Sequence, residues 1–224
     1  MNFNIRAFAT LALVLFKQVA AAQAQDPVAW RDNFTSRLEV LALLETLNAD
    51  LLSHDSATLT LDRWCGDHQL AFPAHIVAKL VERSDKEATP EQRQLLGVSS
   101  SEIVRYRKVR LSCGHHVLSE ADNWYIPSRL RPDMNHVLDT TETSFGRVVR
   151  PLDFRRHTLS AKLLYSPLPK NWEMGTPIAQ QYETTLAIPH AVLQHRAVLT
   201  LPNGTPFSEV VETYTSEVLD FRHR

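Results

Sequence analysis

Two neighbouring strand-like segments constrain the fold of this chain more than any other feature. Residues 103–112 and 117–126 are rich in alternating apolar and polar side chains, which is typical of strands that bury one face. The four residues between them, Cys113-Gly114-His115-His116, form a short connection with a glycine, as hairpin turns do. The pattern therefore predicts an antiparallel β-hairpin near the middle of the chain.

The segments before the hairpin have less regular patterns. Apolar residues recur every three or four positions between residues 34 and 51, which indicates an amphipathic helix capped by Asp32 or Asn33. The next three segments are expected to be a strand, a helix and a polar connection, at residues 57–65, 73–83 and 84–94.

The segments after the hairpin predict a short helix and three more strands. The helix is expected from Pro127 to Leu138, and Thr143-Ser144-Phe145-Gly146-Arg147 is expected to be a turn or the start of a helix. The strands are expected at residues 156–165, 192–201 and 207–219. Because strands and helices do not alternate regularly, the fold class is α+β, with an antiparallel sheet covered by helices.

The first 24 residues have the pattern of a signal peptide. Arg6 precedes the apolar run at residues 7–16, and Ala22-Gln23-Ala24 fits the small-x-small cleavage pattern, so the mature chain would begin at Gln25. The run is too short to span a bilayer. The sequence therefore predicts a protein exported to the periplasm or the medium. Residues 25–224 would form one domain without a membrane span.

The chain has two cysteines, Cys65 and Cys113. Export permits a disulfide between them, because thiols oxidise outside the cytoplasm. Two separate, partly buried thiols fit the sequence as well. The pattern leaves both alternatives open.

Charge and motifs exclude several classes of function. The formal charge of −1 becomes −3 when residues 1–24 are removed, and no basic block occurs, so nothing favours nucleic acid as a partner. The ten histidines form no His-Glu-x-x-His motif, and the cysteines form no Cys-x-x-Cys motif, so no metal site is predicted. Phosphate-binding, dinucleotide and serine-hydrolase motifs are also missing from the sequence.

Six short motifs, in order between about Leu43 and Leu219, resemble those of chorismate lyase, the enzyme that makes 4-hydroxybenzoate from chorismate. They also resemble the UTRA-like ligand-sensing domains of some bacterial transcription regulators. The motifs are Arg107-Lys108-Val109-Arg110-Leu111, Trp124-Tyr125-Ile126-Pro127, Thr143-Ser144-Phe145-Gly146-Arg147, Arg155-Arg156, Gly204-Thr205-Pro206 and Glu212-Thr213-Tyr214. The resemblance implies a six-stranded antiparallel sheet with helical flaps that close over a buried ligand.

The resemblance also implies a binding site for a small aromatic carboxylic acid. Arg107 would bind the ligand carboxylate, because an arginine fork holds a carboxylate through two charge-assisted hydrogen bonds. The backbone amide of Phe145, with Gly146 beside it, would add another donor. Glu212 would face the hydroxyl end of the ligand and exchange a proton there. Strand alternation places Arg107 on the same face as Val109 and Leu111, which are residues typical of a core.

The sequence departs from the family pattern in three places, and two of these keep alternative residues open. The hairpin is one residue longer than in the family, so Arg105 is an alternative to Arg107. The spacing from Gly204 to Glu212 is also one residue longer, so Glu209 is an alternative to Glu212. The loop at residues 167–188 is an insertion.

Two functions follow from the resemblance. The first is an exported chorismate-lyase-like enzyme that converts chorismate, or a related enolpyruvyl precursor, to 4-hydroxybenzoate and pyruvate, with Glu212 as the catalytic residue. Aromatisation of the ring drives that reaction, so it requires no metal or organic cofactor. The alternative is a non-catalytic binding or sensing protein that uses the same pocket for small aromatic acids.

Overall fold

The hairpin predicted from the sequence lies inside the sheet. The computed structural model describes residues 29–81, 85–179 and 185–221. In it, β2 (Arg105–Cys113) and β3 (His116–Tyr125) pair antiparallel along their length. Gly114 in the turn has a φ of 58°, and a Cβ there would lie 2.7 Å from the Cβ of Ala71. Both the backbone conformation and the close approach therefore require glycine at this position.

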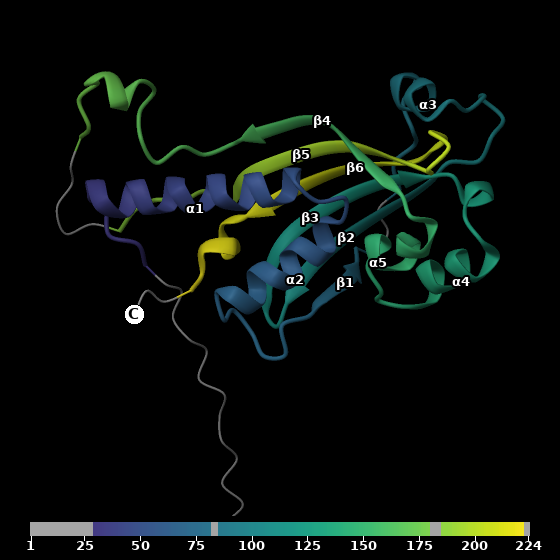
Figure 1. Ribbon diagram of the computed structural model, residues 1–224, viewed down its shortest axis with the longest axis horizontal. Coiled ribbons are helices and arrows are strands. Elements are labelled where there is room, and N and C mark those ends of the chain that lie inside the picture. Colours follow the sequence, from purple (N-terminus) through teal and green to yellow (C-terminus); the bar gives the residue numbers. More distant parts are fainter. Residues whose placement is uncertain (1–28, 82–84, 180–184, 222–224) are drawn as a thin grey trace, which may run out of the picture.

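Four further strands complete one sheet, which Figure 1 shows from its face. They are β1 (Ile76–Leu80), β4 (Arg155–Leu163), β5 (Ala191–Thr200) and β6 (Pro206–Thr215). The strand order is β1-β2-β3-β6-β5-β4, and each pair of described neighbours is antiparallel. The predicted α+β class with a six-stranded antiparallel sheet is confirmed.

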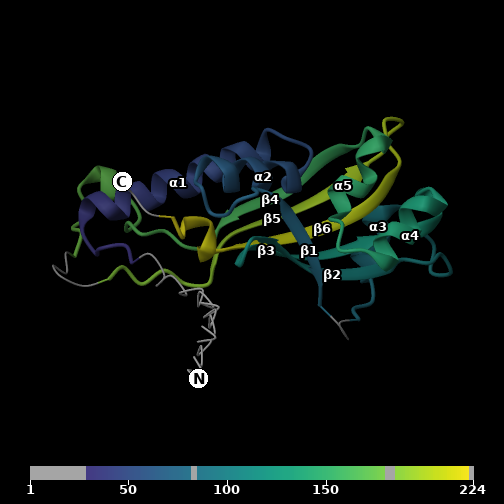
Figure 2. The same ribbon diagram turned by 90° about the horizontal axis from the view of Figure 1, so that it is seen from below.

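Within the described residues there are five α-helices: α1 (Phe34–Leu52), α2 (Ala57–Asp67), α3 (Pro90–Leu96), α4 (Pro132–Thr140) and α5 (Phe145–Val149). Short 3₁₀ turns occur at Pro127–Arg129, Arg150–Leu152, Trp172–Met174 and Ser216–Leu219. Helices α1 and α2 lie on the same side of the sheet, while α3 and α4 lie towards one end of it (Figure 2). The prediction for α1 is confirmed, with Asn33 as its N-cap.

The main core lies between the sheet and the two long helices. Its buried residues include Leu44 and Leu47 of α1 and Leu61 and Trp64 of α2, which pack with strand residues such as Val109. A smaller cluster around Trp124, Leu96 and Ile126 packs α3 against the sheet. Since alternate residues of a strand point to opposite faces, both faces of the sheet are partly covered.

Residues 57–65 were predicted to be a strand, and this prediction is wrong. They belong to α2, whose N-cap Ser56 accepts a hydrogen bond from the amide of Leu59 at 3.4 Å. The alternation of Leu59 and Leu61 suggested a strand. The buried apolar residues, however, follow a helical spacing, at Ala57, Leu61, Trp64 and Cys65.

The predictions for the next two segments are also wrong in part. Within residues 73–83, expected to be helical, the structure forms strand β1, whose buried Ile76 and Ala78 face the core on alternate positions. Within residues 84–94, expected to be a connection, α3 begins at Pro90. Thr89 and Gln92 form its capping box. Residues 82–84 lie outside the described part of the chain.

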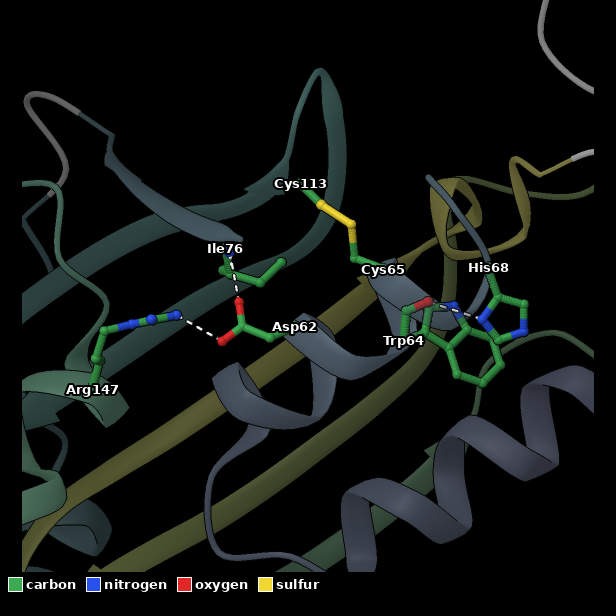
Figure 3. Close-up of a disulfide and its surroundings, with 7 residues drawn as sticks. All are labelled: Asp62, Trp64, Cys65, His68, Ile76, Cys113 and Arg147. Carbon is green, nitrogen blue, oxygen red and sulfur yellow. Dashed lines mark hydrogen bonds and ion pairs between the residues drawn. A yellow bond between two sulfur atoms is a disulfide. The ribbon is translucent and has the colours of Figure 1, made fainter. Parts of the chain in front are cut away.

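Helix α2 is fixed by ties to three other elements, which Figure 3 shows in close-up. A disulfide joins Cys65 to Cys113 at the end of β2. The Asp62 carboxylate accepts a hydrogen bond from the Ile76 amide at 2.7 Å and one from Arg147 of α5, also at 2.7 Å. These ties, at Asp62 and Cys65, hold the second half of α2 against the sheet and α5.

The predicted signal peptide, residues 1–24, lies outside the described residues. Among the helices that the structure describes, none has the length and apolar character needed to cross a membrane.

Candidate ligand-binding site

A cavity lies between the face of the sheet and the first turns of α2 and α5. It contains about 500 Å³ of space not filled by protein atoms, part of it open to solvent. The residues predicted from the family resemblance all line this one cavity, namely Arg107, Phe145, Gly146 and Glu212.

Arg107 is a buried cation with unsatisfied donors. Arg107 is 5% exposed, and the Nη2 atom of its guanidinium donates a hydrogen bond to the carbonyl oxygen of Thr143 at 3.3 Å. Its Nε and Nη1 are buried and have no hydrogen-bond partner within the described part of the chain. Burial lowers the pKa of this guanidinium because the charged form loses its hydration. An anion in the cavity would stabilise it.

The first turn of α5 adds backbone donors beside the cavity. The amides of Phe145 and Gly146 are the first two of the helix, where no helical carbonyl accepts from them. A Cβ on Gly146 would lie 3.1 Å from the Oγ of Ser56 and 3.4 Å from the Oγ1 of Thr58. Glycine therefore lets α5 approach the start of α2 closely and close that side of the cavity.

Glu212 of β6 is held by two donors. The Nη2 of Arg156, on β4, lies 2.5 Å from its Oε2, and the Tyr214 hydroxyl donates to the same oxygen at 3.3 Å. The side chains of Arg156 and Glu212 are 4% and 8% exposed. Burial opposes the charge on Arg156, but Glu212 outweighs it and raises the pKa of the guanidinium. Burial raises the pKa of Tyr214 well above its usual range, so its hydroxyl stays protonated.

A buried histidine lies next to this ion pair. His195 is directly opposite Glu212 in the β5–β6 pair, and its Nε2 lies 2.8 Å from the Oδ1 of Asn48 on α1. Burial lowers the pKa of His195 to about 4, so the ring is neutral near pH 7. The polar network at this end of the cavity therefore carries one positive and one negative charge.

The two alternative residues lie elsewhere. Arg105 has a half-exposed side chain and pairs with Asp139 at 2.9 Å, in a more open hollow that adjoins the cavity at Arg107. Glu209 is fully buried on the opposite face of the sheet, where Arg196 donates to its Oε1 at 2.7 Å. The geometry thus groups Arg107 with Glu212.

Sequence reasoning missed two parts of the site. Arg156 was noted only as the opening of a strand, and its side chain reaches the cavity from an edge strand that is otherwise largely exposed. Ala57 and Thr58 at the start of α2 line the cavity too, but the segment was expected to be a strand. The helical spacing of its buried residues was the available signal.

The cavity combines apolar walls with charged ends. Apolar side chains from β2, β5 and β6 line it, including Val109, Leu111, Leu199 and Val210, and Phe154 adds to them from just before β4. Such a site suits a ring with a carboxylate at one end. Across the described ranges, no group of three or more His, Cys, Asp and Glu residues could hold a metal ion.

Comparison with curated proteins finds a close relative. The chain is 52% identical over 211 residues to the uncharacterized protein y4mC of Sinorhizobium fredii, and the match covers 94% of the chain and 89% of that protein. No model of a known protein family matches the chain.

Comparison with solved structures finds distant similarity to bacterial transcription regulators. PhnF from Mycobacterium smegmatis has a TM-score of 0.47 at 15% identity, covering 86% of this chain and 91% of PhnF. Its effector domain alone has a TM-score of 0.46 at 16% identity, with coverages of 73% and 90%. The possible regulator YydK from Bacillus subtilis has a TM-score of 0.39 at 17% identity, and the match spans 66% of this chain and 61% of YydK.

Proposed function

The chain belongs to the same protein family as y4mC of Sinorhizobium fredii, and we propose that it is an exported binding protein for a small aromatic carboxylic acid. The observation that carries the proposal is Arg107. A guanidinium that is 5% exposed and has two unpartnered nitrogen donors in the described structure calls for an anion. Export rests on the predicted signal peptide at residues 1–24.

The walls of the cavity favour an aromatic ring on that anion. Val109 and Leu111 follow Arg107 on the same face of β2, and Val210 and Leu199 lie across the sheet from them. Burial of an apolar ring against such side chains is favourable, because it removes apolar surface from water. The carboxylate would then bind Arg107 and the first amides of α5.

Titration calorimetry with benzoate and 4-hydroxybenzoate tests the proposal. Arg107→Ala should weaken binding by roughly thirty-fold or more, because losing one partner of a buried charge pair costs about 2–5 kcal/mol. Arg105→Ala is the matched control, since it removes an arginine two residues away that pairs with Asp139 at the surface. Its affinity should stay within about two-fold of wild type. Equal losses in both variants, or no binding by wild type, would refute the proposal.

A second candidate is the lyase activity that the resemblance implies. Glu212 faces the same cavity as Arg107, which is the arrangement that elimination of pyruvate from chorismate would need. Its Oε2 already accepts from Arg156 and Tyr214, which favours a binding role. Purified mature protein incubated with chorismate, with pyruvate assayed directly, separates the two. Glu212→Gln should abolish any pyruvate release while it retains most binding of 4-hydroxybenzoate.

A further inference from the structure

The cavity contains a second arginine that the proposed function does not use. Arg156 extends from edge strand β4 towards β6, and its side chain is 4% exposed. Its Nη2 is engaged by Glu212, but its Nε is buried without a hydrogen-bond partner in the described structure. Buried donors in folded proteins are normally satisfied by protein, water or ligand. An acceptor at this end of the cavity would satisfy it.

The two arginines lie at opposite ends of the site. Arg107 on β2 pairs with Asn123 on β3, and Asn123 pairs with Val210 on β6. Glu212 lies two residues after Val210 on the same strand. With strands about 4.8 Å apart and about 3.4 Å per residue, the Cα atoms of Arg107 and Glu212 are about 12 Å apart. Both side chains line the same cavity, and Arg156 binds Glu212, so the guanidinium of Arg156 lies at the Glu212 end of the cavity, away from Arg107.

The charges around the cavity specify the charge of the occupant. Arg107 and Arg156 contribute two buried positive charges and Glu212 one negative charge, which leaves one positive charge. Asp55 also lines the cavity, but its side chain is 45% exposed and binds the amide of Arg156 at 2.8 Å, so water screens it. One bound carboxylate balances the buried charges, whereas a dianion leaves a negative charge in excess.

We propose that Arg156 is the second anchor of the ligand, and that the site selects an aromatic monocarboxylate whose far substituent is an uncharged hydrogen-bond acceptor. This inference rests on the proposed function, because the ring carboxylate is taken to bind Arg107. Glu212 then acts as the counter-ion that holds Arg156 in place.

Binding of 4-methoxybenzoate and 4-ethylbenzoate to the wild-type mature protein is the first test, by titration calorimetry. The two substituents have similar size, but only the methoxy group accepts a hydrogen bond. The methoxy compound should bind at least ten-fold more tightly, and terephthalate, a dianion, should bind at least ten-fold more weakly than 4-methoxybenzoate. Equal binding of the matched pair, or binding only of 4-hydroxybenzoate, would overturn the role of Arg156. Tight binding of terephthalate would overturn the selection for one charge.

Two variants locate the preference. The double change Arg156→Met with Glu212→Gln removes the ion pair without leaving a lone buried charge, and it should bind the methoxy and ethyl compounds equally. Glu212→Gln alone should retain the preference, because the amide oxygen of glutamine can still accept from the Nη2 of Arg156 and hold it in the cavity. The wild-type comparison decides the proposal even if the double variant does not fold. If wild type binds none of these compounds and no benzoate, the proposed function itself has failed.

Discussion

Cys65 of α2 and Cys113 at the end of β2 are joined by a disulfide, with their Cα atoms 6.4 Å apart. Helix α2 covers the cavity with Ala57 and Thr58 at its start, and β2 carries Arg107 in the opposite wall. The disulfide thus links the two sides of the candidate site through residues that are themselves fully buried.

The disulfide should contribute to the stability of the fold. Cys65→Ala with Cys113→Ala should lower the free energy of unfolding by up to about 4 kcal/mol, because the bridge constrains a long loop of the unfolded chain. Urea unfolding measures this. A reducing agent should reproduce the loss in wild type and leave the double variant unchanged. Two titratable thiols in denatured, unreduced protein from its native compartment would contradict the bridge.

Gly146 should be needed for the close contact between α5 and α2. Gly146→Ala places a Cβ 3.1 Å from the Oγ of Ser56, so the Ser56 side chain or the start of α5 must shift by a few tenths of an ångström. Overpacking of this kind typically costs about 1–3 kcal/mol. We expect a lower melting temperature and several-fold weaker binding of 4-hydroxybenzoate.

A double variant provides the control for this contact. Ser56→Ala removes the Oγ that the new methyl group would approach, so Gly146→Ala with Ser56→Ala should recover part of the lost stability and affinity. Ser56 caps α2 through a bond of 3.4 Å, so Ser56→Ala alone should cost about 0.5–1 kcal/mol. Strictly additive effects of the two changes would show that the contact is not close.

Export is predicted from the sequence alone. The apolar run at residues 7–16 and Ala22-Gln23-Ala24 place the mature N-terminus at Gln25. N-terminal sequencing of the protein from the periplasm or medium of its native host should begin at or next to Gln25. Full-length chain recovered from the cytosol would contradict export.

The sequence predicted the hairpin and α1 because each has a long, regular pattern. Residues 103–126 alternate around a glycine turn, and residues 34–51 keep a helical spacing after the cap Asn33. Helix α2 has 11 residues, against 19 in α1, and two of them are threonines, which also occur often in strands. The alternation of Leu59 and Leu61 was therefore misleading. The secondary structure of a short segment depends on the elements that it packs against, and the local sequence pattern does not show those contacts.

The site was predictable where a charged residue interrupts a core pattern. Arg107 precedes Val109 and Leu111 on one strand face, so its burial could be inferred. Arg156 lies between Arg155 and His157 on an exposed edge strand, and nothing local distinguishes it. Its burial results from the contact with Glu212, 56 residues away in sequence. The periodicity of a sequence does not reveal tertiary contacts of this kind.

His195 should make stability depend on pH. Its pKa is about 4 in the folded protein because burial disfavours the charged ring, against 6.5 for an unperturbed histidine. Between these values the unfolded chain binds a proton that the folded protein does not. The stability that the neutral ring contributes is therefore complete above pH 6.5 and is lost as the pH falls towards 4, by up to about 3 kcal/mol.

Comparison of wild type with His195→Gln isolates this effect. Glutamine is neutral at every pH and can still donate to the Oδ1 of Asn48, which His195 contacts at 2.8 Å. Charged groups far from residue 195 contribute equally in both proteins, so their contribution cancels in the difference. Urea unfolding at pH 7.5, 6.5, 5.5 and 4.5 should show that wild type loses stability more steeply than the variant below pH 6.5. If the stability of the two proteins changes with pH in parallel, protonation of His195 does not destabilise the folded state.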